Sequence, residues 1–205
     1  MSAQRKYLIL LTLFTVFFSV PYSRAENFYN INSLFGISIR EVNSVYTDDN
    51  GFIWASSKNG ILRLTNDDCK VYQLPFESPN VMIAKFVKHS GKLIVYTNNG
   101  QIFNYDEVSD DFYLTVNLSK RLNNKYLYIY DIQIDKSGKL WIASNFGLYT
   151  YSSGKLAFKN RSLTKKILFE WYDKTKLFLV KEDGIWLLDT ESSELKRILK
   201  NKTIN

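Results

Sequence analysis

Residues 51–60 read GFIWASSKNG, so that a glycine turn, a short apolar strand around Trp54 and a second glycine turn follow one another. A related phrase returns at residues 91–100, 138–147 and 175–184. The closing glycines of the four copies are 40, 47 and 37 residues apart, a spacing typical of β-propeller blades. The repetition therefore predicts that each copy is one blade of an all-β fold.

Each copy has the composition of four short antiparallel strands. In the first copy the β-prone and apolar segments are residues 42–47, 52–56, 61–64 and 69–74. In the third copy they are residues 129–135, 140–144, 148–151 and 156–159. Residues that favour turns separate these segments. The second and fourth copies have lost the aspartate that heads the first turn. We predict about four four-stranded antiparallel sheets.

Residues 1–25 have the features of a secretory signal peptide. Arg5 and Lys6 precede an apolar run over residues 7–20, and Ser23 and Ala25 supply small residues for cleavage. An uncleaved membrane anchor is the alternative, although the run is short for a membrane span. We therefore expect an exported protein, periplasmic or secreted, with its propeller segment at 26–205. The expected repeats are residues 37–75, 81–115, 128–160 and 166–199.

Charge and composition limit the classes of partner that the protein is expected to bind. The net charge of +7 would fall to +4 if Arg5, Lys6 and Arg24 left with the signal, because 27 basic residues become 24 against 20 acidic ones. This mild charge does not predict nucleic-acid binding, but it allows acidic glycans or a membrane surface. The single cysteine, Cys69, permits no internal disulfide and is expected to be a partly buried strand residue. One histidine and no repeated acidic loop predict no metal site and no cofactor.

The amino-acid sequence of the first copy points to a more specific family than propellers in general. Residues 35–38, 42–46, 48–56 and 59–64 closely resemble the two-component regulator propeller repeat, and residues 135–151 are a second good match. The resemblance covers roughly residues 28–198. It implies the N-terminal periplasmic sensor region of hybrid two-component sensor histidine kinases of Bacteroidetes, which detect glycan fragments and switch on polysaccharide-utilisation genes.

Members of that family carry more repeats, followed by a β-sandwich, a transmembrane helix and a histidine kinase. This sequence has no kinase motif, so the resemblance implies a ligand-sensing segment that is not an enzyme and has no signalling output of its own. A fragment, a truncated gene product and a stand-alone relative are all compatible with it. Four blades would form an incomplete ring, with apolar faces on the first and last blades that lead to self-association or take further blades. Residues 28–35 have strand character and could supply an outer strand.

Large residues occupy the same place in every copy, namely Trp54, Ile94, Trp141 and Phe178. Such residues could form a sugar-stacking platform, but a recurring large residue is more typical of the core between blades. Asp48 and Asp135 head equivalent turns, where a carboxylate accepts hydrogen bonds from backbone amides. We expect them to stabilise these turns rather than to act as catalytic acids.

Candidate ligand-binding residues lie where the copies differ, in turns and crossovers that open on one mouth of a propeller. Their amides suit sugar hydroxyls, and their cations suit a carboxylate or sulfate. The alternative is that these loops are polar only because they are solvated. The candidates are Lys58, Asn59, Asn98, Asn99, Asn145, Phe146, Lys120, Arg121, Lys125 and Lys181.

Two other classes of function compete with an oligosaccharide sensor. The chain could be a structural or protein-interaction module whose blades complete a larger ring. It could also be a propeller glycoside hydrolase, because Asp131 and Glu170 lie on the expected innermost strands and such enzymes need a pair of carboxyl groups. No third acid in the other copies and no family motif supports this pair, so the hydrolase is the weakest of the three.

Overall fold

In a computed structural model, the chain is described over residues 30–39, 41–58, 60–65, 67–77, 81, 84–89 and 92–201, the side chains of residues 88 and 89 excepted. The expected signal peptide, residues 1–25, lies outside this part. The chain divides into two units, residues 1–37 and 38–205. None of the described helices is long and apolar enough to cross a membrane.

The first unit contains the helix α2 (Ile31–Phe35). The side chain of Asn30 accepts a hydrogen bond from the backbone N–H of Asn32 at 2.9 Å and so caps the N-terminus of the helix. Gly36 ends it in the left-handed conformation, with φ of 64°. Our expectation of a strand over residues 28–35 is therefore wrong for its described part, because local capping chemistry outweighs the β-propensity of Ile31 and Phe35.

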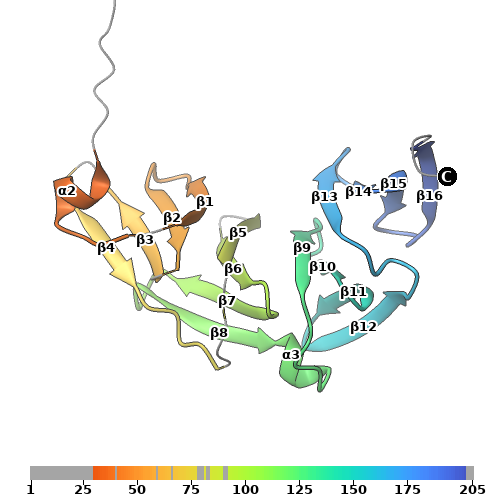
Figure 1. The fold of residues 1–205 in the computed structure, drawn as a ribbon, viewed down its shortest axis with the longest axis horizontal. Coiled ribbons are helices and arrows are strands. Elements are labelled where there is room, and N and C mark those ends of the chain that lie inside the picture. Colours follow the sequence, from red (N-terminus) through yellow and green to blue (C-terminus); the bar gives the residue numbers. More distant parts are fainter. Residues whose placement is uncertain are drawn as a thin grey trace, which may run out of the picture. The chain divides into compact units, whose positions relative to one another are not determined.

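The second unit consists of four antiparallel sheets of four strands each, with the strands of every sheet paired in chain order (Figure 1). The first sheet contains β1 (Val42–Thr47), β2 (Ile53–Ser57), β3 (Gly60–Leu64) and β4 (Cys69–Tyr72). The second contains β5 (Ala84–His89), β6 (Lys92–Thr97), β7 (Gln101–Asp106) and β8 (Asp111–Asn117), followed by the short helix α3 (Leu118–Arg121). The third contains β9 (Ile129–Ile134), β10 (Leu140–Ser144), β11 (Gly147–Ser152) and β12 (Lys155–Asn160). The fourth contains β13 (Ile167–Trp171), β14 (Lys176–Lys181), β15 (Gly184–Asp189) and β16 (Leu195–Lys200). The prediction of four four-stranded propeller blades is confirmed.

The aspartates that head the first turns have the structural role expected of them. One carboxylate oxygen of Asp48, and one of Asp135, accepts hydrogen bonds of 2.9–3.1 Å from the backbone N–H groups two and four residues ahead. The other oxygen accepts from the indole N–H of the following strand, Trp54 at 2.7 Å and Trp141 at 3.0 Å. Each aspartate thus ties its turn to the core.

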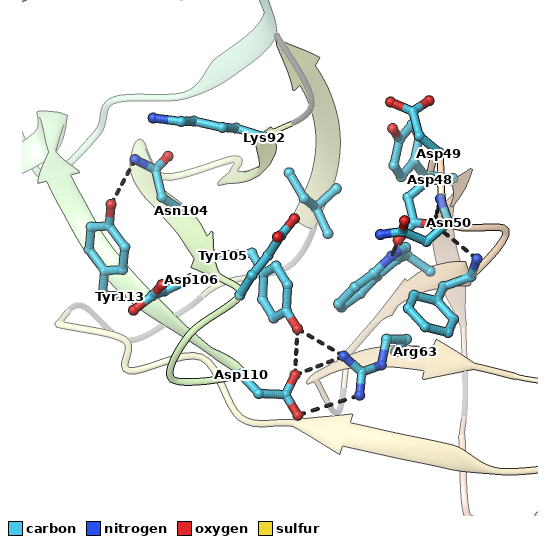
Figure 2. Close-up of a pocket in the computed structure, with 15 residues that line it drawn as sticks. Asp48, Asp49, Asn50, Arg63, Lys92, Asn104, Tyr105, Asp106, Asp110 and Tyr113 are labelled. Carbon is cyan, nitrogen blue, oxygen red and sulfur yellow. Dashed lines mark hydrogen bonds and ion pairs between the residues drawn. The ribbon is translucent and has the colours of Figure 1, made fainter.

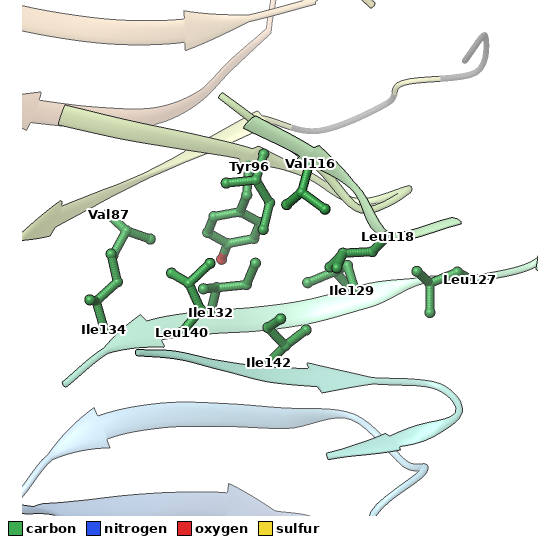
Figure 3. Packing of buried hydrophobic residues seen from close by; sticks show 11 residues of the cluster. Val87, Tyr96, Val116, Leu118, Leu127, Ile129, Ile132, Ile134, Leu140 and Ile142 are labelled. Atoms are coloured by element: carbon green, nitrogen blue, oxygen red, sulfur yellow. The ribbon is translucent and has the colours of Figure 1, made fainter. Parts of the chain in front are cut away.

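Hydrophobic clusters join consecutive sheets. Trp54, which is 1% exposed, packs in the cluster between the first and second sheets, and Trp141, which is 0% exposed, packs in the cluster between the third and fourth. Ile94 is half-buried against the cluster between the second and third sheets, which Figure 3 shows. The packing role predicted for the two tryptophans is confirmed. Cys69 is partly buried on β4, as expected.

The outward side of the fourth sheet carries an uncovered apolar row. Leu168, Val180, Ile185 and Leu199 lie opposite one another on its four strands. Ile185 is half-buried and the other three are between 42% and 57% exposed. Phe178, the counterpart of Trp141, is half-buried on this side and packs against the ring of Tyr172. No hydrophobic cluster of described residues joins the fourth sheet to the first, so the blades form an incomplete propeller.

Candidate functional site

A pocket of about 720 Å³ lies along the first strands of three consecutive sheets, β5, β9 and β13. We call it the inner-strand pocket. Its volume is in the range of pockets that hold small-molecule ligands. Aromatic, amide and cationic side chains converge on it. The lining residues are Lys85, Tyr96, Asn98, Tyr128, Ile129, Tyr130, Asn145, Lys166 and Leu168.

Tyrosines supply the aromatic part of this pocket. Tyr128 and Tyr130 are two positions apart at the start of the third sheet, and their ring centroids are 5.5 Å apart. The Tyr130 hydroxyl donates to the carbonyl of Thr164 at 3.3 Å. Tyr96 is buried, and its hydroxyl donates to Asp131 at 2.9 Å. Burial and the adjacent Asp131 carboxylate raise the pKa of Tyr96 far above its ordinary value, so this phenol stays protonated as a donor.

Asp131 connects three sheets behind the pocket. Besides the Tyr96 hydroxyl, its carboxylate accepts hydrogen bonds from the backbone N–H groups of Ile132 at 2.9 Å and Phe169 at 2.8 Å. Tyr96 belongs to the second sheet and Phe169 to the fourth. The other proposed hydrolytic acid, Glu170, lies opposite Phe178 on the outward side of β14. The structure therefore gives Asp131 a structural role, and Glu170 does not line the pocket.

The cations of the pocket are Lys85 on β5 and Lys166, which directly precedes β13. Neither forms an ion pair with a carboxylate of the described residues. Among the described residues of the lining there is no aspartate or glutamate. Within the described residues, no three His, Cys, Asp or Glu side chains are grouped as metal ligands would be.

Two of the residues predicted from the sequence line this pocket, Asn98 and Asn145. The side chain of Asn145 also holds the preceding crossover, since its oxygen accepts from the Tyr128 N–H and its nitrogen donates to the Tyr126 carbonyl, both at 2.8 Å. The backbone carbonyl of Asn98 accepts from Ile129 at 2.7 Å. These amides therefore shape the wall that carries the tyrosines.

The other candidates do not line the pocket, and most contact their own turn or a neighbouring loop. Lys120 pairs with Glu77 at 3.0 Å, and Lys181 with Asp183 at 3.3 Å. The Asn99 side chain accepts from Thr97 at 2.6 Å and from Gln101 at 3.2 Å. Arg121 donates a hydrogen bond to the Gly154 carbonyl, and the Lys125 ammonium group lies over the Tyr126 ring. Phe146 and Lys58 are exposed. Asn59 lies outside the described residues.

A second, larger hollow of about 910 Å³ lies between the first and second sheets (Figure 2). We call it the inter-blade pocket. It opens between the turn before β2 and the turn after β7. Its lining residues are Tyr46, Asp48, Asp49, Asn50, Phe52, Trp54, Arg63, Lys92, Leu93, Asn104, Tyr105, Asp106, Glu107, Asp110 and Tyr113.

A hydrogen-bonded network closes one side of the inter-blade pocket. Asp110, in the turn of the second sheet, pairs with Arg63 at 2.8 Å and accepts from the Tyr105 hydroxyl (Figure 2). It also pairs with Lys70 at 2.6 Å and accepts from the Tyr72 hydroxyl. Burial alone would raise the pKa of the Asp110 carboxyl, but these hydrogen bonds hold it well below its ordinary value. Because the network is satisfied within the protein, it serves to join two blades, and the inner-strand pocket is the better candidate for a ligand site.

No protein-family model and no curated protein matches this sequence. Solved structures do share the fold. An extracellular domain assigned to the hybrid two-component system BT3049 of B. thetaiotaomicron matches with a TM-score of 0.57 at 16% identity, over 79% of this chain and 25% of that one. The corresponding domain of BT4673 from the same organism matches with a TM-score of 0.58 at 17% identity, over 82% and 26%.

A third match has a different assignment. PorZ, a surface component of the type-IX secretion system of Porphyromonas gingivalis, has a TM-score of 0.57 at 13% identity, over 79% of this chain and 23% of PorZ. At these identities the likeness shows the fold. The resemblance to sensor propellers drawn from the sequence therefore holds at the level of the fold, and the chain spans about a quarter of the length of these structures.

Proposed function

We propose that this chain is the ligand-binding propeller segment of an exported sensor, and that the inner-strand pocket binds a glycan fragment. The observation that carries the proposal is the convergence of tyrosines, amides and two lysines on one pocket formed by three sheets, where no described carboxylate pairs with either lysine. Aromatic rings with a few convergent polar groups are what a binding site for a small polar ligand needs. The extracellular domains with the same fold support the assignment to a sensor.

The position of the pocket suits a sensor for a physical reason. A ligand that contacts Lys85, Tyr130 and Lys166 touches the second, third and fourth sheets together. Such a ligand would stabilise one arrangement of the three blades relative to others. The stabilisation equals the difference between its binding free energies for that arrangement and for the others. We infer that binding is passed on through the packing of these sheets, and that the response itself is made elsewhere.

The proposal is tested by calorimetric titration of the protein with a panel of oligosaccharides. At least one should bind, and Tyr130→Ala should weaken that binding about tenfold or more, since one aromatic contact is worth about 0.5–1.5 kcal/mol beyond its buried area. Tyr113→Ala is the matched control, because Tyr113 is a half-exposed tyrosine of the inter-blade pocket. Loss of binding in Tyr113→Ala alone would move the site to that pocket. Failure of every saccharide to bind would contradict the proposal.

A second function, as an interaction module, is favoured by the apolar row on the fourth sheet. Inside the chain, each sheet buries such a face against the next sheet. The first sheet also exposes apolar residues, among them Val45 and Ile53. We infer that the outward side of the fourth sheet packs on another propeller sheet, which in the purified protein is the first sheet of a second copy.

Sedimentation velocity tests this inference across a range of protein concentrations. We expect self-association that Val180→Lys weakens, because the substitution places a charge in the middle of the apolar row. Val108→Lys is the control, since Val108 is 96% exposed in the turn after β7 and away from the row. A wild-type protein that stays monomeric at all concentrations would show the inference to be wrong.

A further inference from the structure

We propose that the inner-strand pocket is specific for an acidic oligosaccharide, whose carboxylate or sulfate group binds at Lys85 and Lys166. This inference rests on the proposed function, because it names the chemical class of ligand for the same site. It starts from the two cations of the lining, and from the absence of acidic side chains among the lining residues that the structure describes.

Carboxylates already compensate the charges of seven other described lysines. The described lysines with a carboxylate oxygen within 4.0 Å are Lys70, Lys120, Lys136, Lys139, Lys165, Lys176 and Lys181. Lysines without such a partner also occur on the open surface, where water solvates them, and Lys92 lines the inter-blade pocket, where carboxylates outnumber the cations. Lys85 and Lys166 differ from those because they line a concave pocket with no carboxylate among its described lining residues, and Lys85 is half-buried there. Low-dielectric walls strengthen the attraction of such cations for an anion.

The nearby carboxylate does not cancel this charge by pairing with either lysine. Asp131 accepts hydrogen bonds from the Tyr96 hydroxyl and from two backbone N–H groups, and it is not part of the lining. The inter-blade pocket is the opposite case, since its lining contains more carboxylates than cations. The inner-strand pocket is therefore the one of these two whose lining favours a negative ligand.

The placement of the cations also fits an acidic sugar better than a small inorganic anion. Lys85 comes from the second sheet and Lys166 from the edge of the fourth, while Tyr128 and Tyr130 come from the third sheet between them. Lys85 lies opposite Tyr96 in the register of β5 and β6. A sugar ring can pack on the tyrosine rings while its charged substituent binds a lysine ammonium group on a flanking sheet.

Matched pairs of ligands test the inference. Digalacturonate is compared with galactobiose, its neutral counterpart, and sulfated lactose with lactose, by calorimetric titration of the full chain. We expect one anionic member to bind at least about tenfold more tightly than its neutral counterpart, with an affinity that falls as salt is added. The pair that shows the difference identifies the group as a carboxylate or a sulfate.

Neighbouring lysines provide the matched variants. Lys85→Gln and Lys166→Gln should each weaken binding of the anionic ligand severalfold. Lys165→Gln should not, because Lys165 is exposed, pairs with Glu182 at 3.5 Å and does not line the pocket. An equal effect of Lys165→Gln and Lys166→Gln would indicate diffuse surface attraction and overturn the inference.

The failure of this inference differs from failure of the proposed function. Equal binding of the neutral and anionic members of both pairs, lost in Tyr130→Ala, would leave a glycan site without charge specificity. The inference would then be wrong and the proposed function would stand. Absence of binding by all four ligands, and by the wider saccharide panel, would overturn both.

Discussion

Replacement of Trp141 by alanine is expected to lower the free energy of unfolding by about 3–5 kcal/mol, the range for aromatic truncation in a core. Trp141 is fully buried between the third and fourth sheets, where it packs in a cluster with Leu177 and Leu179. Its truncation would leave a cavity, and it would also remove the indole donor from Asp135. Urea denaturation followed by circular dichroism measures the change.

The control for this variant is Tyr126→Ala. Tyr126 is 71% exposed, so its truncation should change stability by no more than about 0.5 kcal/mol, as is usual at the surface. If Trp141→Ala kept its wild-type stability and lost saccharide binding instead, the sugar-platform interpretation of the repeated large residues would be correct and the packing interpretation wrong.

A comparable loss of stability is expected for Gly147→Ala. The backbone of Gly147 has φ of 125°, and an added Cβ would lie 2.4 Å from the carbonyl oxygen of Asn160 on β12. Backbone strain of this kind alone costs about 1–3 kcal/mol, and the contact cannot be relieved without moving a paired strand. We therefore expect the variant to unfold at a markedly lower urea concentration than the wild type.

Gly154→Ala separates the contact from the loss of a glycine. Gly154 also has positive φ, 75°, but nothing lies within 4 Å of its added Cβ. Its substitution should cost only about 1–2 kcal/mol, the penalty of a left-handed conformation for a residue with a side chain. Equal losses in the two variants would mean that the Asn160 carbonyl moves away at little cost.

The fold could be read from the sequence because its signals are local. The turn at residues 48–51, the strand Leu140–Ser144 and the strand Val42–Thr47 lie where the residue types placed them. The helix Ile31–Phe35 could not be read in the same way. Its five residues include β-prone ones, and the helix is stabilised at both ends, by the Asn30 side chain at its N-terminus and by Gly36 at its C-terminus.

The site was harder to predict than the fold. Polar turn residues pointed to Asn98 and Asn145, which line the inner-strand pocket, but the same reasoning also selected Lys120 and Lys181. The ion pair of Lys120 with Glu77 depends on which loops meet in space, and no residue type reveals that. Lys181 instead pairs with Asp183, two residues away in its own turn.

The sequence contains a weak indication of the tyrosines in the inner-strand pocket. Tyr128 and Tyr130 are two residues apart, so they share one face of an extended segment. Whether that face meets the core or a hollow depends on the position of the neighbouring sheets. A strand residue can therefore be assigned to a pocket only after the packing of the blades is known.

The hydrogen bond from each buried tryptophan to its turn aspartate constrains how a blade can change over time. A buried indole N–H without an acceptor is costly, so a lineage that lost Asp135 before Trp141 would pass through an unstable protein. Loss of the tryptophan first leaves the aspartate still bonded to its own turn. The second and fourth copies, with Ile94 and Phe178 at this position, need no acceptor there. In the fourth copy Asp173 still accepts hydrogen bonds from the backbone N–H groups of Thr175 at 2.7 Å and Lys176 at 2.8 Å, so a turn can keep such a carboxylate where no indole needs an acceptor.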